Sequence, residues 1–288
     1  VFMLGYKHVK QGSFSWRLGQ KGLVPLSPPQ KIVNEPQSLV ELMKDHSALY
    51  IRWESEFDVD EATPWWHVIC DRRLELSDLS KNTRNQVRRG MKKFYSEMLS
   101  REVVVEEGYK VYSSSFSRYD THEEQYSEKR FIDAVLGMPE NTEFWGVRDI
   151  DSGALVAFGE NYVEDDVCFC NTAWFDPAAL KEYSSYVFFF DLIQYYLGER
   201  GFRYISDGAR SISHGTQIHE FLQSKFGFRK AYALLNVRYR PLLGMCVGFL
   251  YYFRKLIALV PFKKFKMIAI FLEQERIHRE CNRLKSEG

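Results

Sequence analysis

The chain has 288 residues, of which 45% are hydrophobic and 27% charged, and its net charge is +1. This length and composition suit one large or two small globular domains, and the balanced charge excludes a protein that coats nucleic acid through a field over its whole surface. The five cysteines and seven histidines are scattered without metal-ligand spacing, so we expect a cytoplasmic protein without a bound metal.

The N-terminal part, residues 1–76, is predicted to consist of short strands and loops around one helix. Helical spacing of apolar residues covers 35–44, and buried strands are predicted at 48–53 and 66–70. Between these two strands, the five carboxylates of 54–61 predict an acidic surface loop.

In residues 80–98, apolar and basic residues recur at three- and four-residue steps, which predicts one helix with an apolar stripe and a basic stripe. The apolar stripe consists of Leu79, Thr83, Val87, Met91, Phe94 and Met98. The basic stripe consists of Lys81, Arg84, Arg88 and Lys92, with Arg89 beside it. Either the basic stripe is a solvated helix face, or Arg84 and Arg88 bind phosphates of tRNA or of a nucleotide- or lipid-linked substrate. Seven basic residues against two acidic ones from 78 to 101 favour binding slightly.

From residue 102 to 240 the predicted order is helix, helix, three strands, helix, strand, helix, strand. The period changes from helical to alternating after Pro139. The strands are predicted at 143–148, 155–164, 167–175, 202–206 and 231–238, and the later helices at 181–200 and 214–226.

This order of elements resembles the GNAT acyltransferase fold. In that fold the central strand, here 167–175, parts from its neighbour and offers free backbone groups to an acyl-pantetheine arm. The next helix, here 181–200, takes the pyrophosphate at its N-terminus, where unpaired N–H groups and the helix dipole favour an anion. The resemblance implies an α/β protein whose mixed sheet is flanked by helices.

A narrower resemblance is to the FemABX-like transferases, the peptidoglycan and aminoacyl-transferase-like branch of this fold, which carry two GNAT-like halves. It rests on the segment LSDLSKNTR at 76–84, which runs into VRR at 87–89, and on FLQSKFGF at 221–228. It implies a shortened, degenerate first half at 1–100, a GNAT-like domain at 101–240 and a C-terminal helical extension at 241–288.

The predicted donor loop departs from the GNAT pattern Gln/Arg-x-x-Gly-x-Gly/Ala. The residues here run from Lys181 through Glu182 and Tyr183 to Ser184 and Ser185, without either glycine. Lys181, Ser184 and Ser185 remain the candidate cofactor-binding residues. Bulky side chains and Glu182 disfavour acyl-CoA, whereas FemABX-like proteins use aminoacyl-tRNA and lack such a loop, so the donor stays open between the two.

Three candidate catalytic residues follow from their positions. Glu160 shares a strand face with Val156, Phe158 and Tyr162, where burial would raise its pKa towards the range of a base for an ammonium group; the alternative is an edge glutamate paired with an arginine.

Asp207 follows a buried strand and could orient an amine, and His214 at the next helix could carry a proton. Arg210 is the candidate for binding an anionic substrate group. For these three residues, a turn, a helix cap or a polar surface is an equally good interpretation.

The segment 242–272 combines aromatic with basic residues. It either packs on the domain as a helix pair or rests on an anionic membrane, at the inner face of which the protein would be peripheral. Its apolar run at 241–253 is predicted to be too short to span a bilayer.

Together these observations predict transfer of an acyl or aminoacyl group to an amine of a small-molecule, cell-envelope or polysaccharide-related acceptor. The alternatives are a conventional acyl-CoA N-acyltransferase and a catalytically inactive GNAT-fold binding protein.

Overall fold

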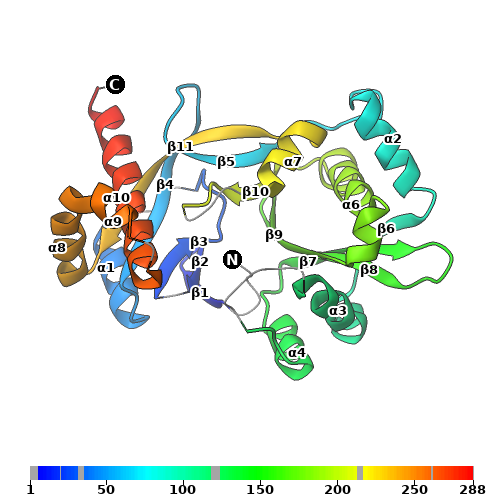
Figure 1. Cartoon of the computed structure of the whole chain (residues 1–288), viewed down its shortest axis with the longest axis horizontal. Helices are drawn as coiled ribbons and strands as arrows, with labels where there is room; N and C mark the ends of the chain where they lie inside the picture. Colours follow the sequence, from blue (N-terminus) through cyan, green and yellow to red (C-terminus); the bar gives the residue numbers. More distant parts are fainter. Residues whose placement is uncertain are drawn as a thin grey trace. The chain divides into compact units, whose positions relative to one another are not determined.

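The computed structural model describes residues 6–19, 21–31, 36–117, 124–212, 217–260 and 262–287 (Figure 1). The chain divides into two compact units, each assembled from separated segments. Unit 1 contains residues 69–208 and 218–229, and unit 2 contains 6–68, 209–217 and 230–288. The division into GNAT-like halves at residues 100 and 240 stays a prediction.

Unit 1 contains five strands in the order β10-β9-β8-β7-β6. Their bounds are β6 (Phe94–Leu99), β7 (Thr142–Asp149), β8 (Leu155–Glu164), β9 (Val167–Phe175) and β10 (Tyr204–Ala209). β10 runs parallel to β9, and the other neighbours are antiparallel. The predicted strands from 143 to 206 are thus confirmed as neighbours in one mixed sheet. The last predicted strand is confirmed as β11 (Arg229–Tyr239), which belongs to the same sheet and pairs antiparallel with β4 (Tyr50–Val59).

Helices cover both faces of the unit 1 sheet. On one face lie α3 (Arg101–Phe116) and α4 (Glu128–Leu136), where the rings of Tyr112 and Trp174 meet edge to face at 4.9 Å. On the other face α6 (Ser184–Ile193) packs Phe188 onto Gly159 of β8. α7 (Gln217–Phe226) packs against α6 on that same face, with Phe221 and Phe189 6.0 Å apart. The mixed α/β fold expected from the sequence is confirmed in this unit.

The long helix expected at 181–200 is divided. A short helix, α5 (Pro177–Lys181), ends before α6 begins, and α6 passes into a π-helical segment at Gln194–Glu199. Between α5 and α6, Tyr183 has a left-handed backbone with φ of 74°, a conformation that side chains with a Cβ rarely adopt. This residue turns the chain into the N-terminus of α6.

The basic helix α2 (Lys81–Gly90) is shorter than predicted. Ser80 caps its start by accepting a hydrogen bond from the Thr83 N–H at 3.2 Å, but residues 94–99 form β6, paired antiparallel with β7. The prediction of one helix to residue 98 is therefore wrong. The sequence of 94–99 fits the spacing of a helix and that of a strand, and pairing with β7 selected the strand.

Unit 2 has six strands in the order β1-β2-β3-β4-β11-β5. The bounds are β1 (Lys7–Gln11), β2 (Phe14–Gly19), β3 (Gly22–Pro25), β4 (Tyr50–Val59), β5 (Trp65–Cys70) and the helix α1 (Pro36–Asp45). β4 continues through the predicted acidic loop. Glu54 of this strand is buried. Its carboxylate accepts a hydrogen bond from Trp65 Nε1 at 3.2 Å and lies 3.4 Å from His67 Nε2, and these contacts compensate for the loss of water.

The C-terminal residues are helical, as expected, and belong to unit 2. α8 (Pro241–Leu250), a 3-10 turn at Tyr251–Phe253 and α9 (Arg254–Ala258) lead into the long helix α10 (Lys263–Glu287). Val247 of α8 and Ile257 of α9 pack on Leu272 of α10, and Figure 1 shows the three helices side by side.

Candidate functional site

The central strand β9 parts from β10 after three paired residues. The register joins Val167–Phe169 to Tyr204–Ser206, and β9 then continues for six residues to Phe175. Residues 169–173 of β9 are half-buried, although both ends of the strand are buried. An extended ligand can pair with a strand along an edge that the neighbouring strand has left. This is the divergence that the resemblance to the GNAT fold implies.

Glu160 of β8 is buried at 1% exposure on the α3 and α4 face of the sheet. Its Oε2 accepts a hydrogen bond from Asn171 Nδ2 at 3.2 Å. Burial raises the pKa of Glu160 to about 8, against the weaker lowering effect of side-chain hydrogen bonds to Asn171 and Trp174. Glu160 is thus buried and carries the raised pKa that was expected, and it has no arginine partner in the described chain.

Asn171 reaches Glu160 because of a β-bulge. The register pairs Glu160 with Thr172 and Asn161 with Cys170, so Asn171 is the extra residue on β9. The bulge lies just beyond the point at which β10 leaves β9. Asn171 therefore connects the buried carboxyl of Glu160 to the half-buried part of the divergence.

Asp207 comes directly after the last residue of β10 that pairs with β9. Its Oδ2 lies 3.3 Å from His219 Nε2 of α7, and both side chains are largely buried. Burial raises the pKa of Asp207, while the contact with His219 acts in the opposite direction. Asp207 thus contacts His219, and its role in orienting an amine stays a prediction. His214, the predicted proton carrier, lies outside the described residues.

Asp207 and Glu160 lie on opposite faces of the sheet. Glu160 shares its face with Phe158 and Trp174, which pack under α3 and α4, whereas the partner of Asp207, His219, comes from α7 on the other face. The two carboxyls therefore do not form one acid–base pair. Next to Asp207, the pKa of Cys170 is raised by a hydrogen bond to Cys168, by burial and by nearby charges, so this thiol stays protonated.

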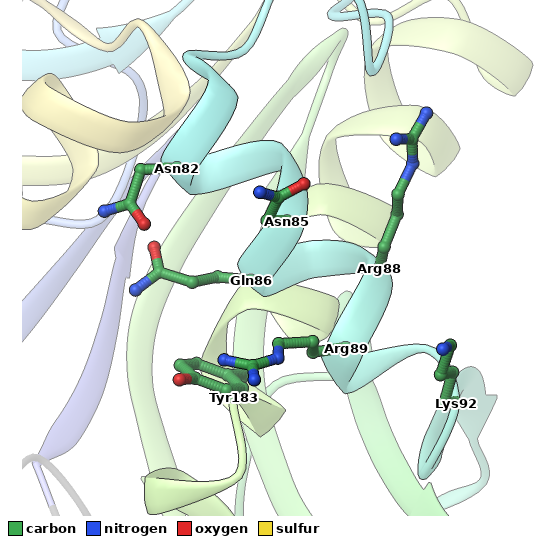
Figure 2. A pocket seen from close by; sticks show the side chains of 7 residues that line it. All are labelled: Asn82, Asn85, Gln86, Arg88, Arg89, Lys92 and Tyr183. Atoms are coloured by element: carbon green, nitrogen blue, oxygen red, sulfur yellow. The ribbon is translucent and has the colours of Figure 1, made fainter.

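A cationic pocket of about 520 Å³ lies between α2 and the residue that precedes α6. It is lined by Asn82, Asn85, Gln86, Arg88, Arg89, Lys92 and Tyr183 (Figure 2). The guanidinium of Arg89 lies alongside the ring of Tyr183, 6.0 Å from its centre. The lining contains three cations and no carboxylate, and none of the three cations forms an ion pair with a described residue. Such a surface favours a phosphate-bearing ligand.

The residues expected to bind a cofactor at the start of α6 are not all accessible. Lys181 is exposed at the end of α5, but Ser184 is fully buried and Ser185 is 9% exposed. Glu182 forms an ion pair with Lys93, whose Nζ lies 2.8 Å from its Oε2. The positive charge of Lys93 therefore compensates the negative charge of Glu182. Two of the three candidate side chains therefore face the interior in this structure.

Gly90 allows α2 to lie against the start of α6. A Cβ at this position would be 2.6 Å from Val187 Cγ2 and 2.8 Å from the Tyr183 carbonyl oxygen, which is closer than atoms can approach. Side chains of α2 and Tyr183 therefore lie at the start of α6, where the resemblance to the GNAT fold predicts a pyrophosphate.

The remaining candidates have structural partners. The Arg84 guanidinium is 3.5 Å from the Ser77 carbonyl oxygen and does not line the pocket, whereas Arg88 does. Arg210 belongs to unit 2, where its Nη1 donates to the Pro64 carbonyl at 2.8 Å and its guanidinium lies 4.5 Å from the centre of the Trp66 ring. Its role in binding substrate stays a prediction.

Sequence reasoning did not single out Asn171, Tyr183, Asn82, Asn85 or Gln86 for the site. The polar run of 82–86 beside the basic residues was a usable signal for the pocket. Nothing in the sequence marks the bulge at Asn171, because a bulge depends on the register with β8. Among the described residues, no group of three or more His, Cys, Asp or Glu is arranged to hold a metal ion.

Neither family models nor curated proteins match the sequence, but solved structures match the fold. FemX has a TM-score of 0.57 at 10% identity, over 83% of this chain and 85% of FemX. The C-terminal DUF2156 domain of a lysylphosphatidylglycerol synthetase from Agrobacterium fabrum gives 0.52 at 13% identity, over 84% and 87%. L-PGS from Bacillus licheniformis gives 0.50 at 14% identity, over 82% and 83%. The chain therefore shares its fold with these three proteins, and the mixed α/β, GNAT-like fold expected from the sequence is confirmed.

Proposed function

We propose that the protein transfers an acyl group, and specifically an aminoacyl group carried by tRNA, to an amine of a small-molecule or cell-envelope acceptor. The observation that carries the proposal is the cationic pocket of Arg88, Arg89 and Lys92 beside Tyr183. It lies next to the helix N-terminus that receives the phosphates of the donor in the GNAT fold. The fold shared with FemX supports the same class of reaction.

The choice of tRNA over coenzyme A rests on how the start of α6 is covered. Gly90 packs on Tyr183 and Val187, and Ser184 is buried, so the backbone there is not open to a compact pyrophosphate. The three cations are exposed instead, Arg88 and Arg89 on α2 and Lys92 in the turn after it, and they line an open pocket. An exposed row of cations suits a long polyanion, whose successive phosphates each contact one side chain.

The half-buried middle of β9 supports a place for the acyl part of the donor. Pairing between β9 and β10 ends at Phe169, so an extended chain can lie along β9 beyond this residue, next to Asp207 and His219. This observation also favours the second candidate, an acyl-CoA N-acyltransferase, because a pantetheine arm is extended as well. The acyl-binding strand therefore does not distinguish aminoacyl-tRNA from acyl-CoA, and the choice between them depends on where their phosphates bind.

In the proposed reaction a neutral acceptor amine attacks the acyl carbonyl. The new C–N bond forms as the ester bond to the ribose oxygen breaks, so the amine loses one proton and the ribose oxygen gains one. His219, oriented by Asp207 at 3.3 Å, is the proposed acceptor of the amine proton. Glu160 is mostly neutral below pH 8 and so is proposed as a proton donor or as a support for Asn171.

The test measures transfer of label from tRNA charged with radioactive amino acids to the amines of a small-molecule and lipid extract from bacterial cells. We expect label to leave the acid-precipitable tRNA and enter the extract, faster with the protein than with the variant Arg88→Gln/Arg89→Gln/Lys92→Gln. A matched control removes three exposed lysines elsewhere, with Lys44→Gln/Lys110→Gln/Lys129→Gln, and should transfer normally. Absence of tRNA binding at low salt together with transfer from acetyl-CoA would overturn the tRNA proposal in favour of the second candidate. Binding without transfer from either donor would favour an inactive binding protein.

A further inference from the structure

A surface in unit 2 exposes large apolar side chains. The C-terminal apolar face consists of six residues of α8, the 3-10 turn and the segment ending α9, each at least 65% exposed: Leu242, Met245, Phe249, Tyr252, Leu256 and Leu259. Exposed patches of this kind on a protein surface mark a site of interaction. A single scattered leucine needs no explanation, but six large residues on one short helical segment do.

The opposite side of the same segment is packed. Val247 and Ile257 are buried against Leu272 of α10, so α8 and α9 are fixed on their inner side while their outer side has no partner in the described structure. The helices therefore have one apolar side packed in unit 2 and a second apolar side open to solvent.

The charges around this face have one sign. From residue 241 to 272 the sequence contains five lysines and arginines and no aspartate or glutamate. Lys255 and Lys266 are exposed, and Arg254 lies 4.3 Å from the centre of the Tyr251 ring. Exposed apolar and aromatic residues with cations beside them, and no acid, are complementary to an anionic lipid surface.

We propose that the C-terminal apolar face docks the protein on an anionic lipid bilayer. The segment Pro241–Ala258 is long and apolar enough to cross a membrane by length and composition, contrary to the sequence-based expectation, and only 11% of it is buried. Docking fits better than spanning, because the segment is broken by a 3-10 turn and packs along α10. A second copy of the chain fits less well, since a symmetric contact would bring the same cations together. This proposal does not depend on the transferase reaction.

The experiment uses Cys246, the one exposed cysteine of the five in the chain, as the site for an environment-sensitive fluorophore. Labelled protein is titrated with vesicles of phosphatidylcholine containing 30% phosphatidylglycerol and with vesicles of phosphatidylcholine alone. We expect a blue shift and a vesicle affinity at least tenfold higher with phosphatidylglycerol at low salt, falling as salt is added. The Cys246→Ser protein, treated with the same fluorophore, corrects for label at the half-buried Cys170.

Variants separate the two contributions. Each of Lys255→Glu and Lys266→Glu should weaken binding to the anionic vesicles about fivefold or more, as expected for about 1 kcal/mol per cation near the surface. The double change Leu256→Ser/Leu259→Ser should weaken it at least about tenfold, because two exposed leucines no longer enter the lipid. The controls Lys129→Glu and Leu136→Ser change exposed residues of α4 in unit 1 and should bind normally.

Three results would overturn the proposal. The first is no binding to phosphatidylglycerol vesicles at low salt. The second is a dimer, measured by light scattering, that Leu256→Ser/Leu259→Ser dissociates, because a second copy then covers the face. The third is resistance of vesicle-bound protein to extraction by alkaline carbonate, which is the behaviour of a spanning helix and not of a docked surface.

Discussion

The Nδ2 of Asn171 donates a hydrogen bond to Oε2 of Glu160 at 3.2 Å across a β-bulge between β8 and β9. Through this bond, a carboxyl that is 1% exposed is connected to a half-buried residue of the diverging strand. Replacement of this carboxyl should therefore affect both the stability of the protein and the candidate site, and the two effects can be measured separately.

Glu160→Gln should change how stability depends on pH. The pKa of Glu160 is about 8 in the folded protein and close to 4.3 in an unfolded chain, so the folded state holds the proton more tightly. The stabilisation that the wild type gains from this proton is complete below about pH 4 and is lost as pH rises to 8, by up to about 5 kcal/mol. The free energy of unfolding of the wild type, relative to Glu160→Gln, should therefore fall between pH 5 and 8 in urea titrations. If the free energies of unfolding of the two proteins changed in parallel with pH, Glu160 would be ionised in the folded protein.

Gly90→Ala should destabilise unit 1. The added methyl group would overlap Val187 and the carbonyl of Tyr183, and such overpacking costs about 1–3 kcal/mol, offset in part by the better helix propensity of alanine. A net loss of about 1–2 kcal/mol is expected in thermal or urea unfolding. Gly248→Ala is the control, since it also lies in a helix and its added Cβ meets no atom within 4 Å. If Gly90→Ala left the free energy of unfolding unchanged, α2 would not pack closely on α6.

Arg88→Gln/Arg89→Gln/Lys92→Gln should reduce the salt dependence of tRNA binding. Each lost phosphate contact lowers the slope of log affinity against log salt by about one, so the slope should fall by about two to three. Melting temperature should stay nearly the same, because exposed substitutions usually change stability by no more than about 0.5 kcal/mol. Lys44→Gln/Lys110→Gln/Lys129→Gln removes the same charge and should keep the wild-type slope in filter binding. Equal slopes for both triple variants would assign the effect to net charge alone.

Acetyl-CoA should bind weakly or not at all in calorimetry. The start of α6 lacks both glycines of the GNAT pattern, and Ser184 is buried there. A Kd in the micromolar range, near −8 kcal/mol, would contradict this expectation. A second titration with Tyr183→Gly then tests whether this side chain is the obstacle, since glycine also adopts the left-handed backbone of Tyr183 without strain.

The sequence by itself determined the elements whose pattern depends on neighbours along the chain. The alternation after Pro139 correctly predicted the order β7–β8–β9, and the helix expected as the first element after residue 102 is α3. The position of Glu160 among apolar residues on one strand face left two alternatives, a buried carboxyl with a raised pKa or an edge carboxylate paired with an arginine, and only the structure selected the first.

The tertiary structure decided what depends on partners far along the chain. Residues 94–99 fit a helix or a strand, and pairing with β7 selected the strand. The register with β8 placed the bulge at Asn171, and the two faces of the sheet separated Glu160 from Asp207. The pocket of Arg88, Arg89 and Lys92 exists because Gly90 lets α2 approach Tyr183, which lies 93 residues further along the chain. Such contacts arise from packing between distant segments, and periodicity along the sequence carries no information about them.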